Sequence, residues 1–236
     1  MIKPKRSGLK DCWNAYLCEG AVFTNEDIPN CPTTAKELPK DMILWDEAKS
    51  IYKKENAKGN TSFYVDAYVC FYMDDYKFDG PNGVWFNCKH ALEILKHFAG
   101  VVTVDFSTYQ DFPEPIKIYN TFRMRALGYW FGTNGLNVIN NVRWGTKESW
   151  KYCWSGISKN SIVAIGTVGG SPRRKKDRKR FNDGFEEMIR VLNPKTIIVY
   201  GSANYDVFKS AEADGIKVVV FKSRTSIAFN EGKNNE

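Results

Sequence analysis

Residues 120–145 read NTFRMRALGYWFGTNGLNVINNVRWG, and the rest of the chain is organised around them. The segment begins with a helical run, contains glycines at 132 and 135, and continues as an apolar strand over residues 137–142. Arg143, Trp144 and Gly145 follow where that strand ends. A helix that leads into a buried strand with polar and aromatic residues at its end is one unit of a repeating βα fold. We therefore expect chemistry at the end of this strand.

The same order of elements extends in both directions along the chain. Apolar runs predict seven strands, and helical spacing predicts a helix after each of the first six. The strands are residues 42–45, 63–73, 101–104, 137–142, 161–165, 196–200 and 216–221, and the helices are residues 46–54, 88–98, 116–131, 147–154, 181–192 and 205–214. Gly100 is expected to end the second helix.

This alternation predicts an α/β fold with a mostly parallel sheet and right-handed crossovers. The strands carry Val and Ile at consecutive positions, as expected when both faces of a sheet are covered. We predict an incomplete or compact (β/α) barrel; the alternative is an open doubly wound sheet, although no G-x-G-x-x-G follows the first strand. The predicted organisation is an irregular N-terminal arm (residues 1–40), the α/β domain (41–229) and a frayed tail (230–236).

Composition sets the class of protein. The chain has 236 residues, 43% of them hydrophobic, which is enough for a full core. No run approaches the roughly 18 apolar residues of a membrane span, and the basic residues at the start are not followed by an apolar signal core. We expect a cytoplasmic protein without a membrane partner.

The six cysteines are spread along the chain without a C-x-x-C pair, so reduced thiols are expected. A zinc site at Cys12, Cys18 and Cys31 would lack a fourth nearby ligand. We predict no metal site, and the sequence leaves any cofactor unknown.

The positive charge is concentrated in one segment. Residues 171–180 hold seven cationic residues and one acid, a net charge of +6 out of +7 for the chain. Affinity for a polyanion would therefore come from one loop and the start of one helix rather than from the whole surface.

Ligands of parallel α/β folds bind at the carboxyl ends of the strands, so the residues just past each strand are the candidates. Asp75 and Asp105 are the predicted acid, base or metal-binding carboxylates; the alternative is that they pair with an arginine or cap a helix. The predicted ligand-binding or phosphate-binding residues are Arg123, Asn141, Arg143, Trp144, Gly166, Thr167, Gly169, Arg173, Arg174 and Ser202.

Each group of candidates has a physical reason. Glycines at 166 and 169 let backbone N–H groups approach a phosphate, which Arg173 or Arg174 would neutralise; the alternative is a plain turn before a solvated basic helix. Arg143 offers a bidentate donor and Trp144 a stacking face.

Arg123 and Arg125 are two residues apart on a predicted helix. Because residues at this spacing face different ways, one is expected to point toward the core or the site and the other to solvent. Pairing with Asp105 or Glu114 is the alternative to ligand contact.

Several motifs resemble an uncharacterised domain family of phages and other mobile elements. They are FYMDDYKF (71–78), VTVDFSTY (102–109), NTFRMRALGYW (120–130), NVRWG (141–145), SIVAIGTVG (161–169) and PKTIIVYGSA (194–203). The resemblance covers about residues 41–221 and implies a phage or mobile-element context, but no catalytic roles. Relatives often carry His at the position of Val168, so this chain departs from the family pattern there.

A fainter resemblance is to queuine tRNA-ribosyltransferases and their DNA-modifying relatives, barrels that exchange a base on nucleic acid. Asp105, Asn120, the Trp144-Gly145 turn and the GTVG at 166–169 carry it. Those enzymes use a late strand-end aspartate as nucleophile, whereas the matching region here reads FKSRTS (221–226), with Arg224. The resemblance thus implies a related fold in which that chemistry is lost.

Three functions follow as hypotheses. The first is binding of a phosphate-bearing ligand, nucleic acid or nucleotide, at the carboxyl ends of the strands. The second is an enzyme of phosphoester or glycosidic, base-exchange-like chemistry on the same ligands, with Asp75 or Asp105 as the reacting carboxylate. The third is an interaction protein that binds a host protein.

Overall fold

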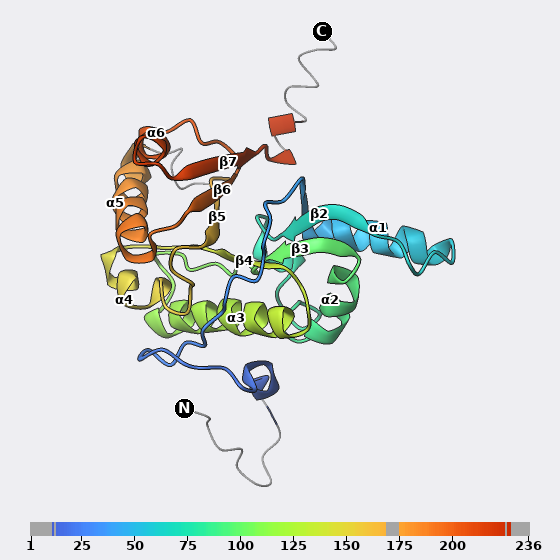
Figure 1. Ribbon diagram of the computed structural model, residues 1–236. Coiled ribbons are helices and arrows are strands. Elements are labelled where there is room, and N and C mark those ends of the chain that lie inside the picture. Colours follow the sequence, from blue (N-terminus) through green and yellow to red (C-terminus); the bar gives the residue numbers. More distant parts are fainter. Residues whose placement is uncertain (1–10, 12, 169–174, 225, 228–236) are drawn as a thin grey trace.

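Seven parallel strands form one sheet whose spatial order is the order of the chain. They are β1 (Met42–Leu44), β2 (Val65–Cys70), β3 (Phe98–Val102), β4 (Val138–Asn141), β5 (Ile162–Gly166), β6 (Thr196–Tyr200) and β7 (Lys217–Phe221). The computed structural model describes residue 11 and residues 13–168, 175–224 and 226–227. The sheet curls into a half-barrel (Figure 1).

A helix follows each of the first six strands. These are α1 (Trp45–Ala57), α2 (Cys88–Leu95), α3 (Glu114–Thr133), α4 (Trp150–Cys153), α5 (Lys175–Leu192) and α6 (Asp206–Ala213), and the 3₁₀ turns are η1 (Ala15–Cys18), η2 (Asp75–Lys77) and η3 (Lys147–Ser149). When every connection joins neighbouring strands with the same hand, all helices lie on one face, and the sheet curls away from them. The six helices lie outside the curled sheet (Figure 1), so the predicted incomplete barrel is confirmed and the doubly wound alternative is wrong.

Side chains that alternate along the strands form two buried layers. Val69, Phe71 and Val101 point toward the helices, and so do Ile197 and Val199 on the other half of the sheet. The inner face is a separate cluster that contains Tyr68, Cys70, Tyr72, Val102, Ile139, Ile198 and Tyr200. Because both faces are buried, the strands need apolar residues at consecutive positions, as the sequence shows.

Gly100 has a different role from the one predicted. The helix ends at Leu95, and Gly100 lies inside β3, opposite Tyr68 of β2. A Cβ atom at this position would lie 2.4 Å from the ring of Tyr68. The glycine therefore makes room for an inner-face tyrosine on the neighbouring strand, which a pattern of local stop signals does not reveal.

The chain before β1 packs along the domain and reaches the amino ends of the central strands. Thr34 Oγ1 donates to the carbonyl of Leu136 at 2.8 Å and accepts the N–H of Val138 at 2.8 Å. Cys31 forms a parallel bridge with Ile157, and Leu38 packs against the inner-face cluster. These contacts place the segment against the bottom of the half-barrel; the predicted boundary at residue 40 stays a prediction.

The first and last strands are joined by side chains rather than by backbone pairing. Arg224, which follows β7, donates its Nε–H to Oε2 of Glu47 at 2.9 Å, and its Nη2 lies 2.9 Å from Oε1. Glu47 also accepts the N–H of Leu44 at the end of β1. The ion pair therefore spans the carboxyl-end side of the half-barrel.

In the described part of the chain, no helix is long and apolar enough to cross a membrane.

Candidate functional site

The carboxyl ends of β2, β3 and β4 are connected by one buried polar network. Arg143 Nη1 lies 2.7 Å from Asp105 Oδ2, and Asn141 Nδ2 donates to Asp105 Oδ1 at 2.7 Å. Asn141 in turn accepts the hydroxyl of Tyr72 at 3.1 Å. The three strands are neighbours in the sheet, so residues that are far apart in sequence meet at this edge.

Burial dominates the electrostatics of this network. It raises the pKa of Asp105 above its usual value, although the charge and hydrogen bond of Arg143 and the hydrogen bond from Asn141 act in the opposite direction. Burial alone would lower the pKa of Arg143, but the neighbouring Asp105 outweighs it, and the pKa of Arg143 is raised. The pair is a charge-assisted contact in surroundings with little water.

Asp75 belongs to the same group of strand-end residues. Its Oδ2 accepts the backbone N–H of Ser107 at 2.9 Å, and its Oδ1 accepts the Ser107 hydroxyl at 2.7 Å. Its charge contributes to the raised pKa of Asp105. Each of the two predicted carboxylates therefore has both oxygens occupied by donors of the chain itself, and a catalytic role for either stays a prediction.

Arg123 does not point to solvent but is buried beside the site. Both of its terminal nitrogens lie 2.8 Å from the carboxylate of Asp79, and Nη2 also donates to Asn120 Oδ1 at 2.7 Å. Its guanidinium lies 3.8 Å from the ring centre of Phe106. Asp79 is a partner that the sequence reasoning missed, since it lies in a loop 44 residues earlier.

Arg125 is fully buried and binds backbone carbonyls. It donates to the oxygens of Ser155 at 3.1 Å, Cys153 at 3.1 Å and Asn141 at 3.3 Å. The expectation that one of the two helix arginines faces solvent is therefore wrong, and neither pairs with Asp105 or Glu114. The reason is that neighbouring segments cover both faces of α3. The loop after η2, with Asp79, lies against Arg123, and the turn after α4, with Ser155, lies against Arg125.

The loops after β5 and β6 are tied together next to the network. Gly166 ends β5, and a Cβ atom there would lie 2.4 Å from the ring of Tyr72. Thr167 Oγ1 donates to the carbonyl of Ser202 at 2.8 Å. Gly169, Arg173 and Arg174 lie outside the described residues, so the predicted phosphate loop is described only at its start.

Trp144 turns toward the helical layer. Its ring lies 5.1 Å from Phe181 and 5.8 Å from Trp154, measured between ring centres. Both neighbours belong to the core between the sheet and α5. The stacking role predicted for Trp144 stays a prediction, because in this arrangement the ring packs within the protein.

A hollow lies on the outer side of the network, where the loop after β4 meets α5. Its volume is about 390 Å³. It is lined by Gly145, Thr146, Lys147, Glu148, Trp150, Lys179, Arg180 and Asp183. We call it the rim hollow. The sequence pattern pointed to its loop and to the basic segment, but it gave no signal for Trp150.

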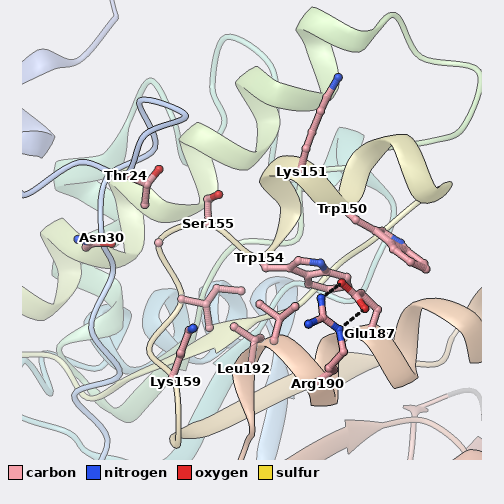
Figure 2. Close-up of a pocket in the computed structure, with 13 residues that line it drawn as sticks. Thr24, Asn30, Trp150, Lys151, Trp154, Ser155, Lys159, Glu187, Arg190 and Leu192 are labelled. Carbon is pink, nitrogen blue, oxygen red and sulfur yellow. Dashed lines mark hydrogen bonds and ion pairs between the residues drawn. The ribbon is translucent and has the colours of Figure 1, made fainter.

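A second hollow, of about 460 Å³, lies elsewhere (Figure 2). It lies between the segment with Thr24 and Asn30, helix α4 and the end of α5, and it contains none of the predicted site residues. The ion pair of Glu187 and Arg190 lies along one side of it (Figure 2). Lys159, which precedes β5, also lines it, so this hollow belongs to the amino-end side of the strands.

The residues that the structure describes contain no candidate metal site. No group of three or more His, Cys, Asp or Glu side chains lies together there in an arrangement suited to a metal ion.

The sequence model of a domain of unknown function, DUF4417, matches residues 22–222. The chain belongs to this family. The predicted resemblance to an uncharacterised phage domain family is thereby confirmed, because the curated relatives of this DUF4417 chain are phage proteins.

Two of these relatives are named Gene 1 protein. The one from Mycobacterium phage L5 is 29% identical over 135 residues, which are 57% of this chain and 57% of the relative. The one from Mycobacterium phage D29 is 28% identical over 135 residues, which are 57% of this chain and 48% of the relative. The alignments thus span about half of each relative. No solved structure gives a significant match. The fainter resemblance to queuine tRNA-ribosyltransferases stays a prediction.

Proposed function

We propose that this DUF4417 chain binds a phosphate-bearing ligand, nucleic acid or nucleotide, at the rim formed by the carboxyl ends of its strands. The observation that carries the proposal is the position of the basic helix. Helix α5 follows β5 at that rim, and it brings Lys179 and Arg180 to the hollow that Lys147 lines from the loop after β4.

The α5 cations at the rim are paired with carboxylates, which a phosphate can replace as their partner. Lys179 is 83% exposed and pairs with Asp183 one helical turn away, and Arg180 pairs with Asp177 at 3.0 Å. The exposed Lys179 pair contributes little free energy, so exchanging its carboxylate for a phosphate oxygen costs little, whereas Arg180 and Asp177 form a more buried pair. Arg180 also donates to Gln110, which joins the loop after β3 to α5. The rim cations are thus tied to the strand-end loops.

The test uses two double variants that remove the same charge. Lys147→Gln with Lys179→Gln removes two rim cations. Lys40→Gln with Lys58→Gln removes two exposed lysines that also pair with acids, one just before β1 and one at the end of α1, so both lie on the amino-end side of the strands. Binding of fluorescently labelled single-stranded and duplex DNA, and of a nucleoside triphosphate, is measured by anisotropy or competition at several salt concentrations.

We expect the affinity of the unchanged chain to fall steeply with salt, because phosphate contacts release counterions. The rim variant should lose affinity and lower the slope of log K against log salt by about 1 to 2 units, whereas the control variant keeps the slope. Absence of binding to every probe at low salt, or equal losses in both double variants, would reject the proposal.

A further inference from the structure

We propose that the ligand of the rim hollow is a single-stranded nucleic acid, one of whose bases stacks on the indole ring of Trp150. This inference rests on the proposed function and adds to it the form of the ligand and the residue that contacts the base.

Trp150 is placed to act as a stacking surface. It is the first residue of α4, it packs partly buried against the core between the sheet and α5, and it lines both the rim hollow and the second hollow (Figure 2). Packing against the core holds the ring in place, while the two hollows leave part of it accessible. A ring held in this way stacks on a base without losing side-chain freedom, which favours binding.

The ring already attracts a cation from the hollow. Lys147 Nζ lies 5.5 Å from the centre of the Trp150 ring. A cation at this distance contacts the π face, and an exposed lysine in such a contact is held more weakly than a stacked base. A base that replaces the ammonium group therefore frees Lys147 to pair with the adjoining phosphate.

The charges that line the hollow explain why stacking is needed. Lys147, Lys179 and Arg180 supply three positive charges, and Glu148 and Asp183 supply two negative ones. Three minus two leaves +1, which is a small electrostatic attraction for a polyanion. Affinity must then come from the aromatic surface as well as from the cations, as in grooves that bind single strands through both.

The form of the ligand follows from the same geometry. The bases of a duplex are paired and stacked on one another, so their faces are closed to a side chain unless the duplex is opened. The base faces of a single strand are accessible to a side chain. A volume of about 390 Å³ falls within the range of small-ligand pockets, about 300–1,000 Å³, and so has room for a nucleotide.

The experiment compares an oligothymidylate with an abasic oligonucleotide of the same length, which has the same phosphates but no bases. Affinities are measured for the unchanged chain, Trp150→Ala, Trp150→Phe and, as a control, Tyr64→Ala, which removes a 65% exposed aromatic ring just before β2 at the opposite end of the strands. Thermal melting is recorded for each variant, and Trp150→Phe preserves an aromatic ring where Trp150→Ala loses core packing.

We expect the unchanged chain to bind oligothymidylate at least about fivefold more tightly than the abasic strand. Trp150→Ala should remove this preference, while Trp150→Phe and Tyr64→Ala keep most of it. Equal affinity for the two strands in the unchanged chain, or an undiminished preference in folded Trp150→Ala, overturns the stacking inference but leaves salt-dependent phosphate binding in place. Absence of binding to both strands at low salt also overturns the inference, and it overturns the proposed function when the duplex and the nucleoside triphosphate do not bind either.

Discussion

Three arginines near the ends of β3 and β4 each have a different kind of acceptor. Arg143 pairs with one carboxylate oxygen, Arg123 with both oxygens of a carboxylate, and Arg125 with backbone carbonyls. Burial lowers the pKa of Arg125 to about 10, so it remains protonated at neutral pH inside the core. Its positive charge is compensated by peptide dipoles rather than by an ion pair, which suits a position that joins α3 to the turn after α4.

At the residue scale, we predict that Arg143→Met destabilises the protein more than Asp105→Asn does. Asp105 is the more buried partner, with 12% of its side chain exposed against 25% for Arg143. Removing Arg143 leaves a buried carboxylate without its counterion, whereas removing the charge of Asp105 leaves a guanidinium that still reaches water and the ring of Tyr109. Urea unfolding at pH 7 should show a loss of about 2–3 kcal/mol for Arg143→Met.

The pH dependence of this loss is the sharper test. The pKa of Asp105 in the folded protein is raised, so the folded state favours the protonated carboxyl, and ionisation of Asp105 costs stability as pH rises through that pKa. Without Arg143 the pKa rises further. The deficit of Arg143→Met should therefore be largest at pH 7 and shrink as pH falls toward 4. Arg190→Met, at an exposed pair on α5, serves as the control and should stay within about 0.5 kcal/mol. A deficit that grows on acidification would contradict the assignment.

At the scale of elements, α5 is positioned by its contact with the end of β4. A Cβ atom at Gly184 of α5 would lie 2.2 Å from the indole ring of Trp144. Phe181 and Phe185 of the same helix flank this contact in the core. The rim cations Lys179 and Arg180 are on this helix, so the close approach of Gly184 to Trp144 also fixes where the positive charge lies.

We predict that Gly184→Ala is destabilising although alanine is the better helix former. Helix propensity alone would favour alanine by about 1 kcal/mol, but the overlap with the indole ring forces the helix or the ring to move. Thermal and urea unfolding should show a net loss of about 1–3 kcal/mol. A second substitution, Trp144→Leu, makes room for the new methyl group, so Gly184→Ala should be less destabilising in that background. A stabilising Gly184→Ala in the unchanged chain would show that the contact is looser than described.

At the scale of the whole molecule, the half-barrel has a protected middle and two different edges: β1 is mostly buried, whereas β7 is exposed. Every residue of β6 is buried, and β6 pairs with a strand on each side. Among the strands of the described residues, β7 pairs with β6 alone, and its residues are partly or largely exposed. The ion pair of Glu47 and Arg224 links the two edges, but more than a third of Arg224 is exposed, so the pair contributes little free energy.

We predict that β6 and β7 differ in their rates of amide hydrogen exchange. Peptides that cover β7 should exchange at least about tenfold faster than peptides that cover β6, because an edge strand opens without unfolding the core. Mass spectrometry of exchanged, digested protein gives both values from one experiment, with β4 and β5 as internal references for the protected middle. Equal protection in β6 and β7 would indicate that another segment covers the β7 edge.

Much of the fold was accessible from the sequence, and the candidate site was accessible in part. The runs around Val199 and Val101 predicted buried parallel strands because only such strands need apolar residues on both faces. The sequence predicts Asp105, Asn141 and Arg143 as site residues because they follow neighbouring strands, and the structure brings them together. Trp150 and Asp79 were missed, since neither stands at a strand end and their importance depends on which loops lie beside them.

The sequence by itself determined the α/β class, the seven strands and the segment that carries the positive charge, since these depend on local composition and on periodicity along the chain. Only the tertiary structure decided that Asp105 pairs with Arg143 while Arg123 pairs with Asp79, that Trp144 packs under α5, and that Gly100 accommodates Tyr68. The physical reason is that partners of buried polar and aromatic groups depend on strand register, helix rotation and loop path. These quantities are fixed by packing the whole half-barrel at once. Residues 120–145 supply one partner of the contacts of Arg143, Arg123 and Trp144, but they do not determine the other partner.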